Sequence, residues 1–460
     1  MTLSIGLQFA VVLAAIWMGA RSSGVGLGLW GAVGLLVLAV AFGINPTSPP
    51  VDVMLIILAV IMAASVMDAA GGIDFLVRVA ERIIRANPKY VTIVAPLVTW
   101  TFTFVAGTGH IVYPLLPVIY ETAYQNGIRP ERPMAVATIA SQQAITASPV
   151  AAATAAMIGL FAEKGLGQWG LAEILMVCVP STLIGVVAAA IASMFVGKDL
   201  KDDPEYQARL KAGKAPASHA YETVPAFAAV GADVVREYKR EERPPLKPTA
   251  KLSAYVFLAG VALVVLFGFF PSLRTLPGAK SALGMPVVIE IVMMSVAAFM
   301  LLATKVKVDD VPKTATLRAG VVAVIGIFGL AWLGDSFIAA NRNVIVPAIG
   351  DWAKVAPWTF AFGLFFASVL LYSQAATTRA LMPLGVALGI PPQFLIAMFP
   401  SVNGYFFIPT YGSLIAAINF DLSGTTRIGK YVLNHSFMLP GLVATSVAVA
   451  VGLFLAQIIF

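Results

Sequence analysis

The sequence contains little charge, one cysteine and three histidines, and these shortages exclude several classes of protein. Only 12% of its 460 residues are charged, whereas about a quarter are charged in a soluble globular domain, so a soluble protein is excluded. Because Cys178 stands alone, neither an intrachain disulfide nor a cysteine metal cluster can form. The motifs of P-loops, H-E-x-x-H metalloproteases and G-x-S-x-G hydrolases are also missing. We therefore expect no enzyme activity and no metal or other cofactor.

Apolar residues make up most of the chain. The hydrophobic fraction is 59%, and apolar runs approach the length of about 20 residues that crosses a hydrocarbon core. These runs predict an all-α polytopic membrane protein surrounded by membrane lipid. The formal net charge of +7 would favour nucleic acid as the partner of a soluble protein, but in a membrane protein it reflects Lys and Arg retained in the cytoplasm. We expect no nucleic-acid partner.

The order of the apolar runs repeats in two halves, 1–196 and 252–460, on either side of a hydrophilic segment at 197–251. Each half has three spans, a broken segment that resembles a hairpin, a broken helix and a final plain span. A short amphipathic stretch, Ile73–Ala86, is predicted to lie in the membrane interface. The predicted hairpins are 90–126 and 355–389, the broken helices are 132–160 and 391–419, and the plain spans include Leu317–Phe337 and Tyr431–Phe460.

The placement of Lys and Arg predicts the orientation in the membrane. If each hairpin is re-entrant, each half makes five crossings and the two halves are inverted relative to each other. With the N-terminus outside, 24 Lys and Arg residues lie in the cytoplasm and 5 lie outside. Without the central segment the count is still 13 against 5. Counting the first hairpin as two full spans gives the same parity. We predict that both termini are periplasmic and that 197–251 is a cytoplasmic loop.

Four polar breaks interrupt the apolar segments, two in each half at matching positions. Backbone groups freed from a helix at membrane depth cost several kcal/mol each unless they are buried in protein or face a water-filled cavity. Half-helix N-termini present N–H groups and positive dipole ends, which suit an anion at the membrane midplane. The alternative is that these residues only kink or pack helices. The candidate substrate-binding residues are Gly107, Thr108, Gly109, His110, Ser141, Gln142, Thr146, Ser148, Ser373, Gln374, Thr377, Thr378, Arg379, Asn403 and Thr410.

Two of these candidates have a sharper functional interpretation. Arg379 lies in the middle of an apolar segment, where a charge is costly and its planar guanidinium suits a carboxylate. The alternatives are snorkelling to the outer interface or pairing with an acid such as Asp335. His110 could donate to an anion or carry a proton, or it could cap a helix end. Because the membrane interior contains few acids, an anionic substrate is favoured over a cationic one.

Gly26, Gly28 and Gly31 match the pattern G-x-G-x-x-G of dinucleotide-binding proteins. No strand precedes them and their surroundings read as a membrane helix, so close helix packing is the better interpretation.

Several strings in the sequence resemble the anaerobic C4-dicarboxylate transporters of Gram-negative bacteria, the Dcu family. The resemblance covers nearly the whole chain and implies inner-membrane transport of fumarate, succinate, malate and aspartate, commonly as exchange of fumarate for succinate. The strings are PPVDVMLIILAV (Pro49–Val60), NPKYVTIVAP (Asn87–Pro96), GTGHIVYPLLPVIYE (Gly107–Glu121), IRPERPMA (Ile128–Ala135), ASPV (Ala147–Val150) and SGTTRIGKYVLNHSFMLPGL (Ser423–Leu442).

A more distant likeness is to the ion-transporter superfamily that includes sodium-coupled dicarboxylate and citrate carriers. Those proteins carry a Ser-Asn-Thr type motif at each hairpin tip, and here Gly107–Gly109 and Ser373–Thr377 take similar places. The first tip departs from the motif, so a sodium site is not carried over to it, and the coupling ion stays open between Na⁺ and H⁺. The likeness implies an elevator mechanism and a homodimer.

Some Dcu carriers also act with a membrane sensor kinase, and those have an acid near the motif Pro409–Tyr411. This chain has Gly412, Ser413 and Leu414 there, which favours a plain carrier.

These observations lead us to expect a secondary active carrier for C4-dicarboxylates. One carboxylate would be held by Thr108, Gly109 and the polar block Ser141–Ser148. The other would be held by Thr377, Thr378 and Arg379, with Asn403 and Thr410. Two alternatives remain: the membrane subunit of an ion-pumping decarboxylase complex, which would need acids at the midplane, and a passive anion channel.

Overall fold

The fold is helical throughout the described residues of the computed structural model, which are 3–22, 25–212, 245–279 and 281–460. In these ranges the only β-type pairing is an isolated bridge between Ile428 and His435. Seven of the described helices are long and apolar enough to cross a membrane. The prediction of an all-α polytopic membrane protein is therefore confirmed at the level of helices and spans.

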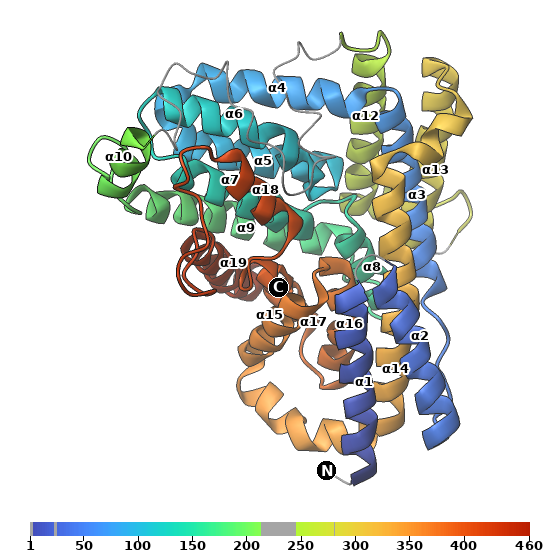
Figure 1. Ribbon diagram of the computed structural model, residues 1–460. Helices are drawn as coiled ribbons and strands as arrows, with labels where there is room; N and C mark the ends of the chain where they lie inside the picture. The colour runs from blue at the N-terminus through green and yellow to red at the C-terminus, as the bar shows by residue number, and fades with distance from the viewer. Residues whose placement is uncertain (1–2, 23–24, 213–244, 280) are drawn as a thin grey trace.

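Six long helices pack side by side in what we call the six-helix bundle (Figure 1). Its centre is α14, which packs against both α2 and α3, while α13 packs against α3 and α12. The six helices are α1 (Leu3–Ser22), α2 (Gly26–Phe42), α3 (Val51–Ala69), α12 (Ala250–Phe269), α13 (Met285–Thr304) and α14 (Ala315–Val355).

Glycines bring α2 and α14 into direct backbone contact. A Cβ at Gly28 would overlap the carbonyl group of Ile325, and one at Gly31 would lie 2.5 Å from the carbonyl carbon of Gly329. Only residues without a side chain allow two helices to approach this closely. The G-x-G-x-x-G pattern is thus a helix-packing motif, as predicted.

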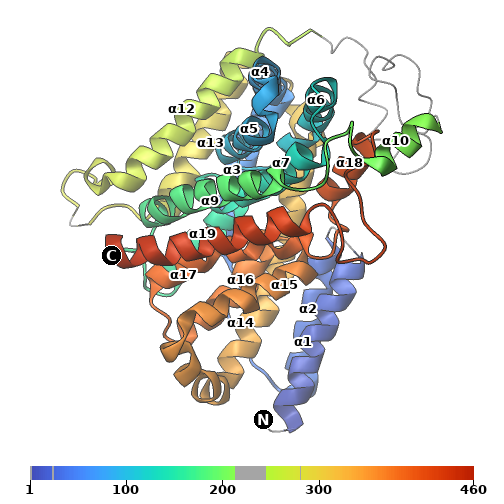
Figure 2. The ribbon, with the colours of Figure 1, turned by 90° about the vertical axis from the view of Figure 1, so that its left-hand side faces the viewer.

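The remaining membrane helices form a second group, the hairpin bundle, in which α9 and α19 lie side by side (Figure 2). The amphipathic helix α4 (Gly72–Ala86) lies at the upper edge of the view in Figure 1 and packs against α5, α6 and α12. The other helices are α5 (Val91–Ala106), α6 (Val112–Gln125), α7 (Glu131–Gln143), α8 (Ala152–Glu163), α9 (Leu171–Met194), α15 (Phe360–Leu371), α16 (Gln374–Ala387), α17 (Pro392–Met398), α18 (Gly412–Phe420) and α19 (Met438–Ile459).

Short 3₁₀ segments flank several of these helices and lie at the breaks. They are η1 (Pro88–Tyr90), η2 (Gly109–Ile111), η3 (Ala144–Thr146), η5 (Pro271–Arg274), η6 (Val308–Lys313), η7 (Pro357–Thr359) and η8 (Phe399–Phe406).

Apart from α4 in the first half, both halves of the chain have the same order of elements: three helices, a helical hairpin, a broken helix and a final long helix. The packing recurs as well. The contact of α2 with α14 has its counterpart in that of α13 with α3, and the contact of α8 with α16 in that of α18 with α6. A pair of elements from one half is thus matched by the corresponding pair with the halves exchanged.

Two spans differ from their predicted bounds. The helix predicted over Leu317–Phe337 continues to Val355, while the last helix starts at Met438 instead of Tyr431. In the loop before α19, polar side chains satisfy backbone groups that a helix would otherwise pair. The Asp421 carboxylate accepts from the backbone N–H groups of Ser423 and Thr426. This local pairing offers the chain an alternative to helix.

Part of the central hydrophilic segment docks onto the hairpin bundle, and 213–244 lies outside the described residues. Helix α10 (Pro204–Lys211) is N-capped by Asp203, which accepts from the N–H groups of Glu205 and Tyr206. Arg129 forms ion pairs with Asp203 and, at 2.6 Å, with Glu131. Burial raises the pKa of the Asp203 carboxyl, but the Tyr206 N–H and the Arg129 guanidinium outweigh it, so this pKa lies below its ordinary value.

Candidate functional site

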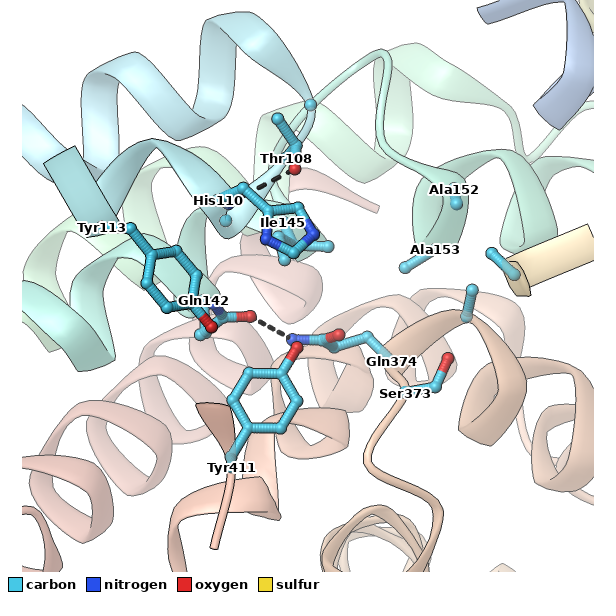
Figure 3. Close-up of a pocket in the computed structure, with 14 residues that line it drawn as sticks. Thr108, His110, Tyr113, Gln142, Ile145, Ala152, Ala153, Ser373, Gln374 and Tyr411 are labelled. Atoms are coloured by element: carbon cyan, nitrogen blue, oxygen red, sulfur yellow. Dashed lines mark hydrogen bonds between the residues drawn. The ribbon is translucent and has the colours of Figure 1, made fainter. Parts of the chain in front are cut away.

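A cavity of about 150 Å³ lies where the breaks of the hairpin bundle meet (Figure 3). Its lining comes from both hairpin tips, from the two sides of the first broken helix, and from the residue that precedes α18. The six-helix bundle contributes one lining residue, Ala323 of α14. Figure 3 shows His110 and Tyr113 on one side of this space, with Gln142, Gln374 and Tyr411 facing them.

Four helix N-termini converge on the cavity. The residues that precede these helices have extended backbones, with φ/ψ of −139/134° at Thr108, −83/147° at Ala151, −147/116° at Ser373 and −71/141° at Tyr411. The first N–H groups of a helix have no acceptor within it, and the N-terminus carries the positive end of the helix dipole. The chain thus surrounds one small space with four partial positive charges.

Both hairpins reverse direction by the same local geometry. The last residue before each tip is left-handed, with φ of +71° at Gly107 and +50° at Tyr372, and an extended residue follows. Gly107 suits this conformation and also lets the tip approach the first broken helix, because a Cβ there would lie 2.6 Å from the Val150 carbonyl oxygen. Tyr372 is uncommon in this conformation and is held by a 2.7 Å hydrogen bond between its hydroxyl and Thr410.

The two tip hydroxyls act as helix caps. Thr108 Oγ1 accepts from the His110 N–H at 3.3 Å, and Ser373 Oγ accepts from the Ala376 N–H at 3.2 Å. The His110 ring stacks on Tyr113 with centroids 5.8 Å apart. His110 thus lines the cavity at a helix start that Thr108 caps, and its role toward an anion or a proton stays a prediction.

A chain of side-chain amides, which we call the amide ladder, runs behind the cavity. Gln374 Nε2 donates to Gln142 Oε1 at 3.0 Å and to Asn403 Oδ1 at 3.2 Å. Asn403 Nδ2 donates to Gln143 Oε1 at 3.2 Å, and Gln143 Nε2 donates to Thr445 Oγ1 at 2.7 Å. All five side chains are buried. The ladder joins the tip of the second hairpin, both broken helices and α19 through uncharged groups.

Seven of the fifteen residues predicted as ligands line the cavity: Gly107, Thr108, Gly109, His110, Gln142, Ser373 and Gln374. Most of the other predicted ligands instead donate a hydroxyl hydrogen to a backbone carbonyl. The donor and acceptor residues are Ser141 and Gly109, Ser148 and Phe104, Thr377 and Ser373, and Thr378 and Gln374. Thr146 bonds to the Gln143 carbonyl, and Asn403 and Thr410 act through the ladder and Tyr372. These residues therefore stabilise the breaks through hydrogen bonds within the protein.

Sequence reasoning missed several lining residues, among them Tyr113, Ile145, Ala152, Ala375 and Tyr411. What these residues share is their position in the sequence, because each lies within a few residues of a break. A selection of polar residue types inside the breaks leaves out apolar residues and the first residues of the helices that follow.

Arg379 lies outside the lining of the cavity and is fully buried. Its Nη1 is 3.0 Å from Glu163 Oε2, and its Nη2 is 3.3 Å from Asp335 Oδ2. The structure therefore brings Arg379 to protein carboxylates, including the Asp335 pairing named as an alternative, rather than to the cavity. A guanidinium within a membrane protein is stabilised best by opposite charge, and this cluster supplies it from α8 and α14.

The fold and this cavity define a multi-pass helical membrane protein with an internal polar site, the class to which membrane transporters belong. The chain belongs to the family of anaerobic C4-dicarboxylate membrane transporters, whose sequence model matches residues 4–460. The family resemblance inferred from the sequence is thereby confirmed. The chain is a transporter, not an enzyme.

Three relatives illustrate the similarity. The chain is 39% identical to the anaerobic C4-dicarboxylate transporter DcuB of Escherichia coli O6:H1, over 97% of each protein. It is 41% identical to the C4-dicarboxylate transporter DcuA of Escherichia coli K12, over 98% of each. It is 39% identical to the C4-dicarboxylate transporter DcuA of Wolinella succinogenes, over 98% of the chain and 99% of the relative.

Proposed function

We propose that the protein is a secondary active carrier of C4-dicarboxylates in the bacterial inner membrane, which transports fumarate, succinate, malate and aspartate by exchange or by cation-coupled uptake. The observation that carries this proposal is the convergence of four helix N-termini on one small cavity. A dianion gains from each such end about 0.3–2 kcal/mol, depending on burial. The names of the similar transporters supply the substrate class.

The two ends of the substrate would bind at different pairs of helix ends. One carboxylate lies at Thr108, Gly109 and the start of α8, and the other lies at Ser373, Gln374 and the start of α18. No lysine or arginine lines the cavity among the described residues. Binding by neutral donors suits a carrier, because an uncharged site costs less than a buried full charge when the substrate leaves it on the other side.

The location of the cavity supports an elevator mechanism. All lining residues except Ala323 come from the hairpin bundle, so the substrate would travel with this bundle past α14. We propose that the six-helix bundle is the stationary part and forms a homodimer, and that the two halves are inverted repeats with both termini periplasmic. The repeated order of elements and the exchange of their contacts are what inverted repeats require.

The test is uptake of labelled succinate by proteoliposomes that contain fumarate, aspartate or no internal substrate, with and without sodium and a proton gradient. Uptake that depends on internal fumarate establishes exchange, and a sodium or proton requirement names the coupling ion. Uptake that does not saturate and needs neither a counter-substrate nor a gradient of ions would replace the carrier with an anion channel.

A further inference from the structure

The amide ladder has a fixed direction. Asn403 Nδ2 donates to the backbone carbonyl of Pro400 at 3.1 Å. A carbonyl oxygen only accepts, so this contact determines which end of the Asn403 amide is nitrogen. The Asn403 oxygen then faces Gln374, which must present its own nitrogen to it. One main-chain group thus orients the whole ladder.

The direction of the ladder determines what the cavity offers to a substrate. The two hydrogens of Gln374 Nε2 go to Asn403 Oδ1 and Gln142 Oε1, which leaves Gln374 Oε1 without a protein partner in the described part of the chain. Gln142 Oε1 is used in the same contact, so its Nε2 hydrogens are left. Both side chains line the cavity (Figure 3). The ladder therefore displays one donor, from Gln142, and one acceptor, from Gln374.

An acceptor is unexpected in a cavity for dicarboxylates, because a carboxylate offers no hydrogen to it. The C4 acids differ in this respect at C2: aspartate carries an ammonium group and malate a hydroxyl, whereas succinate and fumarate carry no donor. A hydrogen bond to a charged group is stronger than one between neutral groups, so the acceptor favours the ammonium group of aspartate more than the hydroxyl of malate. An acceptor beside the substrate thus separates these acids.

We infer that the amide ladder determines the choice among C4-dicarboxylates, with Gln374 Oε1 as the acceptor for the C2 substituent of aspartate or malate and Gln142 Nε2 as a donor to a substrate carboxylate. Asn403 is a positioning residue, which acts through Gln374. The inference rests on the proposed function, since it divides substrates within the class proposed above.

The test is competition by unlabelled aspartate, malate and succinate against labelled succinate uptake in fumarate-loaded proteoliposomes. Gln374→Met keeps the length of the side chain and removes the acceptor. We expect the ratio of the inhibition constants of aspartate and succinate to rise about tenfold, and that of malate and succinate to rise less. Gln8→Met is the matched control, because Gln8 is also 8% exposed but lies in α1; this ratio should not change.

Asn403→Leu tests the orientation itself. Loss of the Asn403 oxygen frees Gln374 to rotate, so the same ratio should rise by a smaller factor. Where a variant does not transport, the shift of Tm by aspartate and by succinate in detergent gives the ratio. An equal loss of affinity for aspartate, malate and succinate in Gln374→Met would overturn the inference and assign the ladder a purely structural role. Wild-type protein that exchanges no C4 acid would instead overturn the proposed function.

Discussion

Helix α16 carries two polar regions of opposite design. Its first residue, Gln374, belongs to the cavity, where uncharged amides and helix ends surround a space for an anion. Five residues further along, Arg379 lies in an ion cluster with Glu163 and Asp335. The described lining of the cavity contains polar groups but no lysine or arginine, whereas the cluster consists of full charges of opposite sign.

The difference shows that the protein binds its substrate in one region and holds its two helix bundles together in another. The ion cluster joins α16 and α8 of the hairpin bundle to α14 of the six-helix bundle, with Arg379 3.0 Å from the Glu163 carboxylate and 3.3 Å from that of Asp335. The cavity offers only dipoles, to which a dianion can bind and from which it can be released. A charge in the membrane interior is costly when its partner departs, and a dipole much less so.

The largest effect is expected from Arg379→Ala. It leaves two carboxylates without their cation, which for a buried pair costs about 3–5 kcal/mol. We expect a large fall in Tm in detergent. A triple variant with Arg379→Leu, Glu163→Gln and Asp335→Asn should recover most of the loss and bind succinate within a few fold of wild type. Loss of succinate binding in that stable variant would instead restore Arg379 as a substrate ligand.

The next effect is expected at Gly109, where the tip of the first hairpin meets the ladder. A Cβ there would overlap the side-chain amide of Gln142, so Gly109→Ala should displace the donor of the cavity at a cost of about 1–3 kcal/mol. Succinate affinity should fall about tenfold. Gly167→Ala is the control, since a Cβ at Gly167 meets no atom within 4 Å. Unchanged affinity in Gly109→Ala would mean that this tip does not contact substrate.

Smaller effects are expected from the two caps. Thr108→Ala and Ser373→Ala each remove an acceptor from a tip N–H, which costs about 1 kcal/mol. Each should weaken succinate binding about fivefold, with near-additive losses in the double variant, as calorimetry can measure. Thr138→Ala, which removes a hydroxyl bonded within α7, should leave binding unchanged. A loss in only one of the two cap variants would contradict equal use of both tips.

The smallest effect concerns a third polar region, at α10, where water competes with the ion pairs. Because the folded pKa of Asp203 is lowered, its contribution to stability is present above the unfolded pKa of about 3.9 and is lost as the pH falls through the folded pKa. Proteolysis at α10 should therefore increase below about pH 4. Asp203→Asn should show increased proteolysis already at neutral pH, with transport retained. A pH dependence equal in both proteins would assign the loss to other groups.

Much of the architecture follows from local properties of the chain. Apolar runs identify the membrane helices, and the polar breaks at Gly107–Gly109 and Ser373 mark both hairpin tips within a residue. At the first tip, a left-handed glycine followed by a capping hydroxyl is a signal that needs no tertiary contact. The prediction for α14 ends at Phe337 instead of Val355, because the polar end of this helix does not meet a hydropathy criterion.

The sequence by itself therefore determined the class of protein, its family and the places where helices break, because hydropathy, glycine and capping act over a few residues. Only the tertiary structure decided which polar side chains face the cavity. Thr377 bonds to a carbonyl four residues away, whereas Ser148 bonds to that of Phe104, 44 residues away, and Arg379 pairs with Glu163, 216 residues away. A helix start can be read from its own residues, but the direction of each side chain depends on which distant element supplies the partner that makes its burial affordable.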